Sequence, residues 1–185
     1  MATAAKLADT PFTDVATLRA NARKHIEQGA VTRSYPADRE AIVAKLQESL
    51  ATEWVCVLRY TRHYHTATGF VSEPVKAHFL AHAKEEQAHA MMLAERIVQL
   101  GGAPDLNPDH LTKLSHAEYR EGKTLKDMVK EDLVAERIAI DSYRELIDYI
   151  GDRDTTTRKM LVHILEQEEE HADEFSDLLD GWEGE

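Results

Sequence analysis

Along four stretches of this chain, apolar residues recur at alternating spacings of three and four positions, which is the pattern of amphipathic α-helices. These stretches cover about residues 38–67, 72–100, 124–151 and 155–180. Each would form a helix about 40 Å long. The connections before residues 72 and 155 are short, so the helices should pair as two antiparallel hairpins. The pattern therefore predicts an all-α fold, an antiparallel four-helix bundle.

The connection between the second and third helices, residues 101–123, is much longer than the usual link between bundle neighbours. It is therefore expected to cross the length of the bundle. Asn107 and Pro108, followed by Leu111 and Leu114, predict a short helix within this crossover.

The first 37 residues are predicted to form an arm that precedes the bundle domain of residues 38–185. The arm contains one short amphipathic segment before Gly29, marked by Val15, Leu18, Ala22 and Ile26. We expect this segment to form a short helix and to pack against the main body.

The composition narrows the functions that such a bundle could serve. Hydrophobic residues make up 43% and charged residues 30%, with 8 Gly and 5 Pro, which excludes a disordered or collagen-like chain. The formal net charge of -12 repels nucleic acids and anionic lipid surfaces, so cations are the more natural partners. A lone Cys56 supports no disulfide framework, and no secretory leader or membrane-spanning run is present. We expect a cytoplasmic protein without a membrane partner.

Each predicted helix carries a carboxylate in the middle of its apolar stripe, where a hydrophobic residue would be expected. These residues are Glu53, Glu86, Glu136 and Glu168. Two of them begin the pattern Glu-x-x-His, which brings His89 and His171 onto the same stripes. With 20 Glu and 10 His in 185 residues, chance predicts about one such pattern, so the pattern alone is weak. The stronger indication of a common site is that all six residues lie on the apolar stripes of their helices and at the same depth in the bundle.

Four ionised carboxylates inside an apolar bundle would each cost several kcal/mol and would repel one another. Protonation of a metal-free polar network is one way to remove this cost. Two divalent cations are the favoured alternative, because their charge of +4 balances the four carboxylates and imidazoles can serve as nitrogen ligands. Mixed carboxylate and imidazole ligation suits iron or manganese, with zinc also possible.

With these motifs, residues 40–180 resemble the ferritin-like superfamily, and bacterioferritin in particular. The resemblance rests on Glu53 in the run Thr52-Glu53-Trp54-Val55, the Glu-x-x-His patterns at Glu86 and Glu168, and Glu136 after Asp132-Leu133-Val134-Ala135. It implies two irons per subunit. Glu53 and His89 would be terminal ligands of one iron and Glu136 and His171 of the other, with Glu86 and Glu168 bridging.

Three features depart from bacterioferritin. Gln87 stands where that family has its haem-ligating Met, so no haem is expected. Only 14 residues follow His171, which leaves no room for a fifth C-terminal helix. The short helix expected in the crossover is similar to the Dps mini-ferritins, so the resemblance implies a Dps-like shell, a homo-oligomer of twelve subunits.

The function implied by this resemblance is a ferroxidase that oxidises Fe(II) with peroxide or dioxygen, stores Fe(III) and protects against oxidative stress. Other dimetal enzymes, such as a peroxidase or a phosphodiester hydrolase, remain alternatives. A DNA-protecting shell protein is another, although the charge does not indicate DNA binding, and a metal-free helical interaction module is a third.

Several residues near the expected centre allow more than one interpretation. Tyr60 and Tyr143 lie seven residues beyond Glu53 and Glu136, and they could be hydrogen-bond partners of the ligands, electron donors or ordinary core tyrosines. His82 is expected to be a core histidine rather than an accessory ligand. We expect His63 to lie on the surface.

Overall fold

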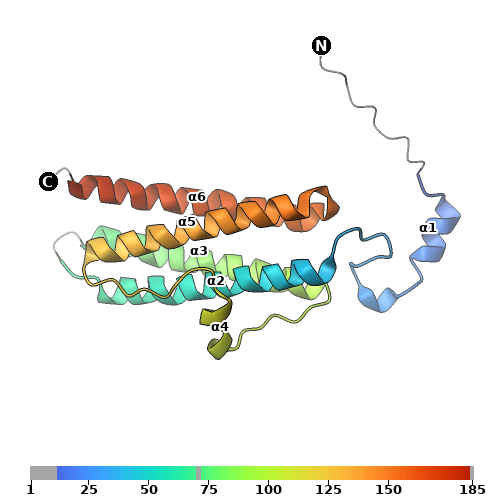
Figure 1. The fold of residues 1–185 in the computed structure, drawn as a ribbon, viewed down its shortest axis with the longest axis horizontal. Coiled ribbons are helices and arrows are strands. Elements are labelled where there is room, and N and C mark those ends of the chain that lie inside the picture. The colour runs from blue at the N-terminus through green and yellow to red at the C-terminus, as the bar shows by residue number, and fades with distance from the viewer. Residues whose placement is uncertain (1–11, 70–71, 184–185) are drawn as a thin grey trace, which may run out of the picture.

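The fold is a four-helix bundle, as the apolar pattern predicts (Figure 1). A computed structural model describes residues 12–69 and 72–183. Its long helices are α2 (Arg39–Thr66), α3 (Ser72–Gln99), α5 (Leu125–Ile150) and α6 (Thr155–Glu183). Helix α2 packs most extensively on α3, and α5 packs most extensively on α6. No strand occurs among the described residues.

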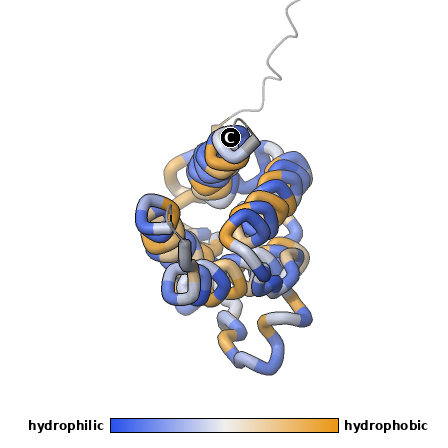
Figure 2. Tube along the Cα trace, turned by 90° about the vertical axis from the view of Figure 1, so that its left-hand side faces the viewer, coloured by the Kyte–Doolittle hydropathy of each residue, from blue (hydrophilic) through white to orange (hydrophobic). Residues whose placement is uncertain are grey.

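Two apolar clusters fill the interior of the bundle and lie on either side of its polar centre. One is built around Leu46, Leu93, Ile147 and Ile164, and the other around Tyr60, Phe79, Val129 and Phe175. Figure 2 looks along the bundle and shows hydrophobic and hydrophilic positions alternating along each helix. This alternation gives each helix one face for the core and one for water.

Local signals in the sequence place most of the helix ends. Asp38 caps α2 by accepting a hydrogen bond from the backbone of Ala41, and Thr124 forms a capping box with Asp127 at the start of α5. Gly151 ends α5 with a positive φ of 52°. The predicted end of the fourth helix near residue 180 is wrong, because α6 continues to Glu183. Trp182 packs against the core there.

The crossover runs along α2, as its length predicts, and it contains the short helix α4 (Pro108–Leu114). The backbone of Asp105 exchanges hydrogen bonds of 2.9 and 2.7 Å with the side chain of Gln47 near the start of α2. Farther along, the backbone N–H of His116 donates to Thr52 Oγ1 at 2.9 Å. Leu111 of α4 is buried against the middle of α2.

The arm contains α1 (Val15–Asn21) and a single 3-10 turn, Ile26–Gln28. The expectation that this amphipathic segment packs against the main body is wrong, since Val15 and Leu18 are 59% and 53% exposed. Figure 1 shows α1 standing clear of the bundle. The contact is made later in the arm, where Tyr35 packs on the core and its hydroxyl donates to Asp154 at 2.7 Å.

None of the helices in the described part of the chain is both long and apolar enough to cross a membrane.

Candidate metal centre

The structure brings the six polar residues of the four apolar stripes together at the middle of the bundle. We call them the central cluster: Glu53, Glu86, His89, Glu136, Glu168 and His171. Each residue is at most 3% exposed. Each of the four long helices supplies one carboxylate, and α3 and α6 add the two histidines. The shared depth predicted from the stripes is therefore present in the fold.

Both imidazoles turn their Nδ1 atoms toward the carboxylates. His89 Nδ1 lies 2.9 Å from Glu168 Oε1 and 3.4 Å from Glu53 Oε2. His171 Nδ1 lies 3.2 Å from Glu86 Oε1 and 3.9 Å from Glu136 Oε2. The two rings thus face opposite sides of the same group of oxygens.

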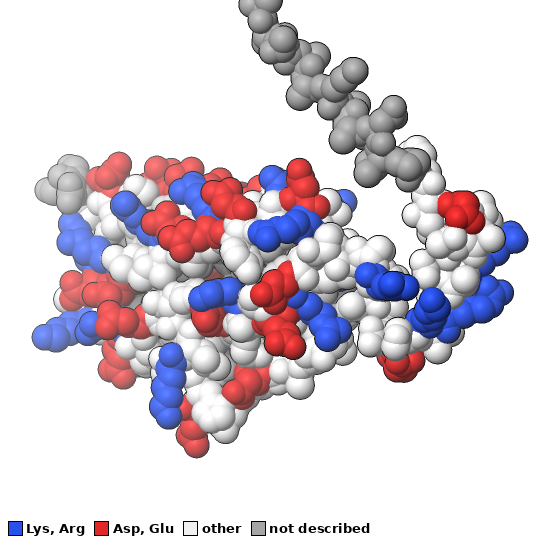
Figure 3. Space-filling view, turned by 45° about the vertical axis from the view of Figure 1, so that its right-hand side comes forward, with Lys and Arg blue, Asp and Glu red and all other residues white. Residues whose placement is uncertain are grey.

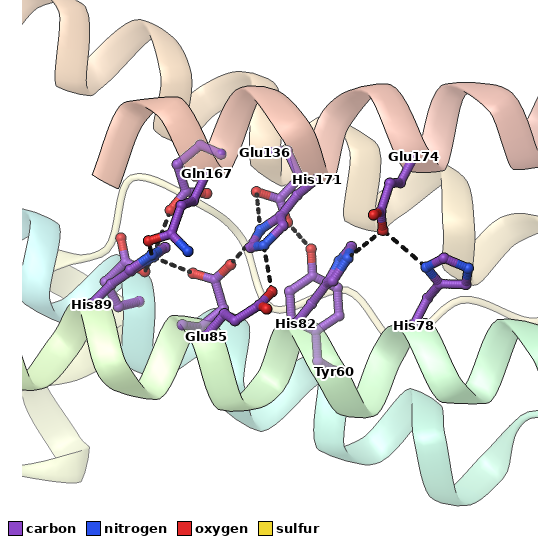
Figure 4. A network of polar contacts seen from close by, with 12 residues as sticks. Tyr60, His78, His82, Glu85, His89, Glu136, Gln167, His171 and Glu174 are labelled. Atoms are coloured by element: carbon purple, nitrogen blue, oxygen red, sulfur yellow. Dashed lines mark hydrogen bonds and ion pairs between the residues drawn. The ribbon is translucent and has the colours of Figure 1, made fainter. Parts of the chain in front are cut away.

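The outer nitrogen of each ring is held by a residue outside the central cluster (Figure 4). His89 Nε2 contacts Gln167 Oε1 at 3.1 Å, and His171 Nε2 contacts Glu85 Oε2 at 2.8 Å. A metal-ligating histidine commonly donates its second ring N–H in this way, which fixes the tautomer and leaves the other nitrogen free to bind. The arrangement fits metal ligation through Nδ1.

Two tyrosines hold carboxylates from across the bundle. Tyr60 of α2 donates its hydroxyl to Glu136 of α5, and Tyr143 of α5 donates to Glu53 of α2. Both side chains are almost completely buried. Of the interpretations open from the sequence, the geometry matches hydrogen-bond partners of the carboxylates.

Several buried atoms of the central cluster make no hydrogen bond of regular geometry, although the ring nitrogens lie within ion-pair distance of the carboxylates. They are Glu53 Oε2, Glu86 Oε1, both carboxylate oxygens of Glu168, and the Nδ1 atoms of His89 and His171. Buried polar atoms are satisfied in most proteins, so a concentration of unsatisfied ones calls for an explanation. All of these atoms are metal-ligand types, and they are gathered in one place.

The cluster divides into two groups whose ligating atoms lie within 4.8 Å of one another. One group is Glu53, Glu86, His89 and Glu168, and the other is Glu86, Glu136, Glu168 and His171. Glu86 and Glu168 belong to both. The donor set therefore fits two adjacent cations with two shared carboxylates.

Electrostatics inside the cluster favour protons when no metal is bound. Burial, together with neighbouring carboxylates, raises the pKa of Glu53 and of Glu168 well above the ordinary value. Burial opposes charge on His171, but the nearby carboxylate of Glu86 raises its pKa to about 9. Burial likewise opposes charge on His89, but the nearby carboxylates of Glu168 and Glu53 raise its pKa strongly. The protons shared among these residues are ones that a cation would displace.

A buried ion-pair network that the apolar pattern does not predict lies beside the central cluster. Arg59 Nε pairs with Asp132 Oδ1 at 2.7 Å, and His63 Nδ1 contacts the other oxygen of Asp132 at 2.8 Å. The expectation that His63 lies on the surface is therefore wrong. The crossover covers this side of α2, because His63 Nε2 and Arg59 also reach the backbone oxygens of Glu121 and Glu118.

The sequence also raised expectations for His82 and Gln87, which lie near the central cluster on α3. His82 is buried as expected, with its Nε2 atom 2.9 Å from Glu174 Oε2 and no partner for its Nδ1 atom. Gln87 lies on the exposed face of α3. The absence of haem stays a prediction.

Comparisons with known proteins agree with this architecture. The family described as a ferritin-like domain matches residues 43–184. The chain belongs to the ferritin-like family. The DNA protection during starvation protein of Pyrococcus furiosus is 31% identical to this ferritin-like chain over 149 residues, covering 78% of the chain and 80% of the relative. A bacterioferritin of Mycobacterium avium is 26% identical over 140 residues, covering 75% and 84%.

Among solved structures, the ferritin-like chain is similar to the bacterioferritin-related protein of Bacteroides fragilis, described as a dodecameric thioferritin. The identity is 29% and the TM-score 0.76, with coverage of 79% of this chain and 88% of that one. These relatives combine the two resemblances found in the sequence, to bacterioferritin and to Dps.

Proposed function

We propose that this chain is a ferroxidase and iron-storage protein that oxidises Fe(II) at the central cluster with peroxide or dioxygen. The observation that carries the proposal is the pair of four-residue groups that share Glu86 and Glu168 at the buried middle of the bundle. Two irons per chain would neutralise the charge of the four buried carboxylates.

The proposed ligand arrangement follows the two groups. Glu53 and His89 would hold one Fe(II), Glu136 and His171 would hold the other, and the two shared carboxylates would bridge them. Bound side by side, two Fe(II) ions can each give one electron to the same oxidant, so no one-electron oxygen radical need be released. Iron is the substrate here as well as the occupant of the cluster.

The surrounding residues would fix the cluster before iron arrives. The hydroxyls of Tyr60 and Tyr143 hold one oxygen of Glu136 and Glu53, which leaves the other oxygen of each carboxylate for a cation. Gln167 and Glu85 fix the two imidazole rings from outside. Such preorganised outer partners typically matter about 10- to 100-fold in metal affinity.

We further propose that twelve copies of the chain form a shell that retains the Fe(III) product. The support is the similarity to the protein described as a dodecameric thioferritin. Light scattering of the native protein tests this directly. A monomer or dimer at micromolar concentration would contradict the proposed shell.

Anaerobic titration with Fe(II), followed by stopped-flow absorbance after adding peroxide or air, tests the ferroxidase. We expect saturation near two irons per chain and rapid oxidation. Glu86→Ala and His171→Ala should lose both, whereas Glu170→Ala should behave as the native chain, since Glu170 is exposed on the same helix as His171. Iron binding without oxidation would overturn the proposal and favour another dimetal enzyme, such as a peroxidase or a phosphodiester hydrolase.

DNA shielding is a second candidate, favoured by the basic residues of the arm. Arg19, Arg23, Lys24 and Arg33 are exposed there (Figure 3), and the Pyrococcus furiosus relative is named a DNA protection protein. The net charge of -12 opposes DNA binding. Gel retardation at increasing salt decides, because binding through the arm should weaken steeply with salt and disappear in a chain that lacks residues 1–33.

A further inference from the structure

A second group of potential metal ligands lies beside the central cluster, on the side of the bundle where α3 and α6 meet. We call it the groove cluster: His78, His82 and Glu174. His78 Nδ1 and His82 Nε2 each lie 2.9 Å from the same atom, Glu174 Oε2. The ligating atoms of all three residues are within 4.8 Å of one another. Figure 4 shows the two imidazoles converging on this carboxylate.

We propose that the groove cluster is a third divalent-cation site, and that it passes cations from solution to the central cluster. His78 and His82 are four residues apart, which places both rings on one face of α3. Bonds of about 2.1 Å from one cation to a nitrogen and an oxygen at right angles put those atoms about 3.0 Å apart. The observed separations need little adjustment to accept a cation.

The groove cluster is open to solvent on one side and buried on the other. The side chains of His78 and Glu174 are 38% and 39% exposed, whereas that of His82 is 2% exposed. They line a cavity of about 300 Å³ whose walls include the small residues Ala77 and Ala81. A hydrated cation can therefore approach from outside and exchange some of its waters for protein ligands.

His82 connects the open side of the groove cluster to the interior of the bundle. Its Nε2 atom faces Glu174, while its Nδ1 atom on the other side of the ring is buried and makes no hydrogen bond. Glu174 supplies the carboxylate of the groove cluster, and its Oε2 atom is shared by the two histidines.

His82 also connects the groove to the central cluster. The rings of His82 and His171 are stacked, with centroids 4.0 Å apart and an angle of 17° between their planes. His82, Glu136 and His171 also form a group of ligating atoms within 4.8 Å. Glu85, which contacts His171, lines the groove as well. A cation at the groove cluster would be separated from His171 of the central cluster only by the ring of His82.

Cation binding by this group does not depend on what the central cluster does, whereas delivery rests on the proposed function. Co(II) is a suitable probe for both, because it is not oxidised under the conditions of binding and its absorption reports its ligands. Native protein, His78→Ala and Glu174→Ala should be titrated with Co(II) by calorimetry and absorbance. His163→Ala is the matched control, because His163 is an exposed histidine of α6 that lies outside the groove cluster.

We expect three Co(II) per chain for the native protein and His163→Ala, and two for His78→Ala and Glu174→Ala. Glu86→Ala should keep the groove site and lose Co(II) at the central cluster. Equal stoichiometry in native protein and both groove variants would overturn the proposed site. Binding of a single Co(II) that is lost in His78→Ala would support the groove site and contradict the proposed dimetal centre.

Delivery is tested by stopped-flow at less than one Co(II) per chain. Loss of either groove residue should slow the appearance of Co(II) at the central cluster severalfold, with its final occupancy at saturating Co(II) unchanged. If the variants fill the central cluster at the native rate, the groove cluster is not on the path and that half of the proposal fails.

Discussion

Loading the central cluster with two divalent cations should release protons, because four of its six residues can be protonated when no metal is present. The pKa of His171 is raised to about 9 and that of His89 is raised strongly, so we expect both imidazoles to carry a proton on Nδ1 at pH 7. Burial and like-charge repulsion also favour the protonated forms of Glu53 and Glu168. Each of these protons must leave before the atom can ligate a cation.

The expected release is about two protons per chain, because each histidine and the carboxylates that it faces share protons rather than all being protonated together. By linkage, the constant for filling both positions then rises about 100-fold for each unit of pH near neutrality. Above pH 9 the pH dependence of the metal-binding constant should weaken by about one proton, because His171 of the metal-free protein is already deprotonated there.

Anaerobic calorimetry with Zn(II) in two buffers of different ionisation enthalpy counts the protons directly. Glu168→Gln should reduce the release by about one proton if Glu168 is protonated in the native apo protein. Glu170→Gln, an exposed change on the same helix, should leave it unchanged. A release below two protons per chain at pH 7, or a binding constant independent of pH between 6 and 8, would refute this electrostatic account.

Three further substitutions test how the cluster and the fold are held. Tyr143→Phe removes the hydroxyl that holds Glu53, so metal affinity should fall about 10-fold in a Zn(II) competition titration. Arg59→Met leaves the carboxylate of Asp132 buried without its guanidinium partner, which should cost about 3 to 5 kcal/mol in urea unfolding. For Asp154, burial raises the pKa, but hydrogen bonds from neighbouring donors lower it from 3.8 to about 2. Its ionised form therefore stabilises the native chain by about 2 kcal/mol above pH 4, and this is lost as the pH falls toward 2. Asp154→Asn should remove that stabilisation and flatten the acid limb of the stability curve.

Each of these substitutions has a surface counterpart that should have little effect. Tyr119→Phe, Arg62→Met and Asp152→Asn change exposed or half-exposed side chains and should each alter stability by less than about 1 kcal/mol. If Arg62→Met were as destabilising as Arg59→Met, burial of the ion pair would not be the reason for the loss. If Asp154→Asn kept the native acid limb, another group would have to account for it.

The sequence by itself determined the helices, their hairpin pairing and the depth of the central cluster. A helical period of 3.6 residues fixes which side of each helix faces the core, so a carboxylate on the apolar stripe must be buried wherever the bundle closes. That is why Glu53, Glu86, Glu136 and Glu168 could be chosen before any fold was known. The long connection likewise required a crossover, since its ends belong to helices that are not paired as a hairpin.

Only the tertiary structure decided which residues from distant parts of the chain come into contact. Periodicity places a side chain on a face, but it does not say which other helix or loop covers that face. Arg59 lies off the predicted stripe of α2 and is buried where the crossover reaches the flank of that helix, and Asp132 of α5 is buried against it. Glu174 meets His78 from 96 positions away, a contact that no local pattern encodes. The sequence therefore specified the charges of the central cluster, and the packing of distant segments determined their partners and the other buried charges around them.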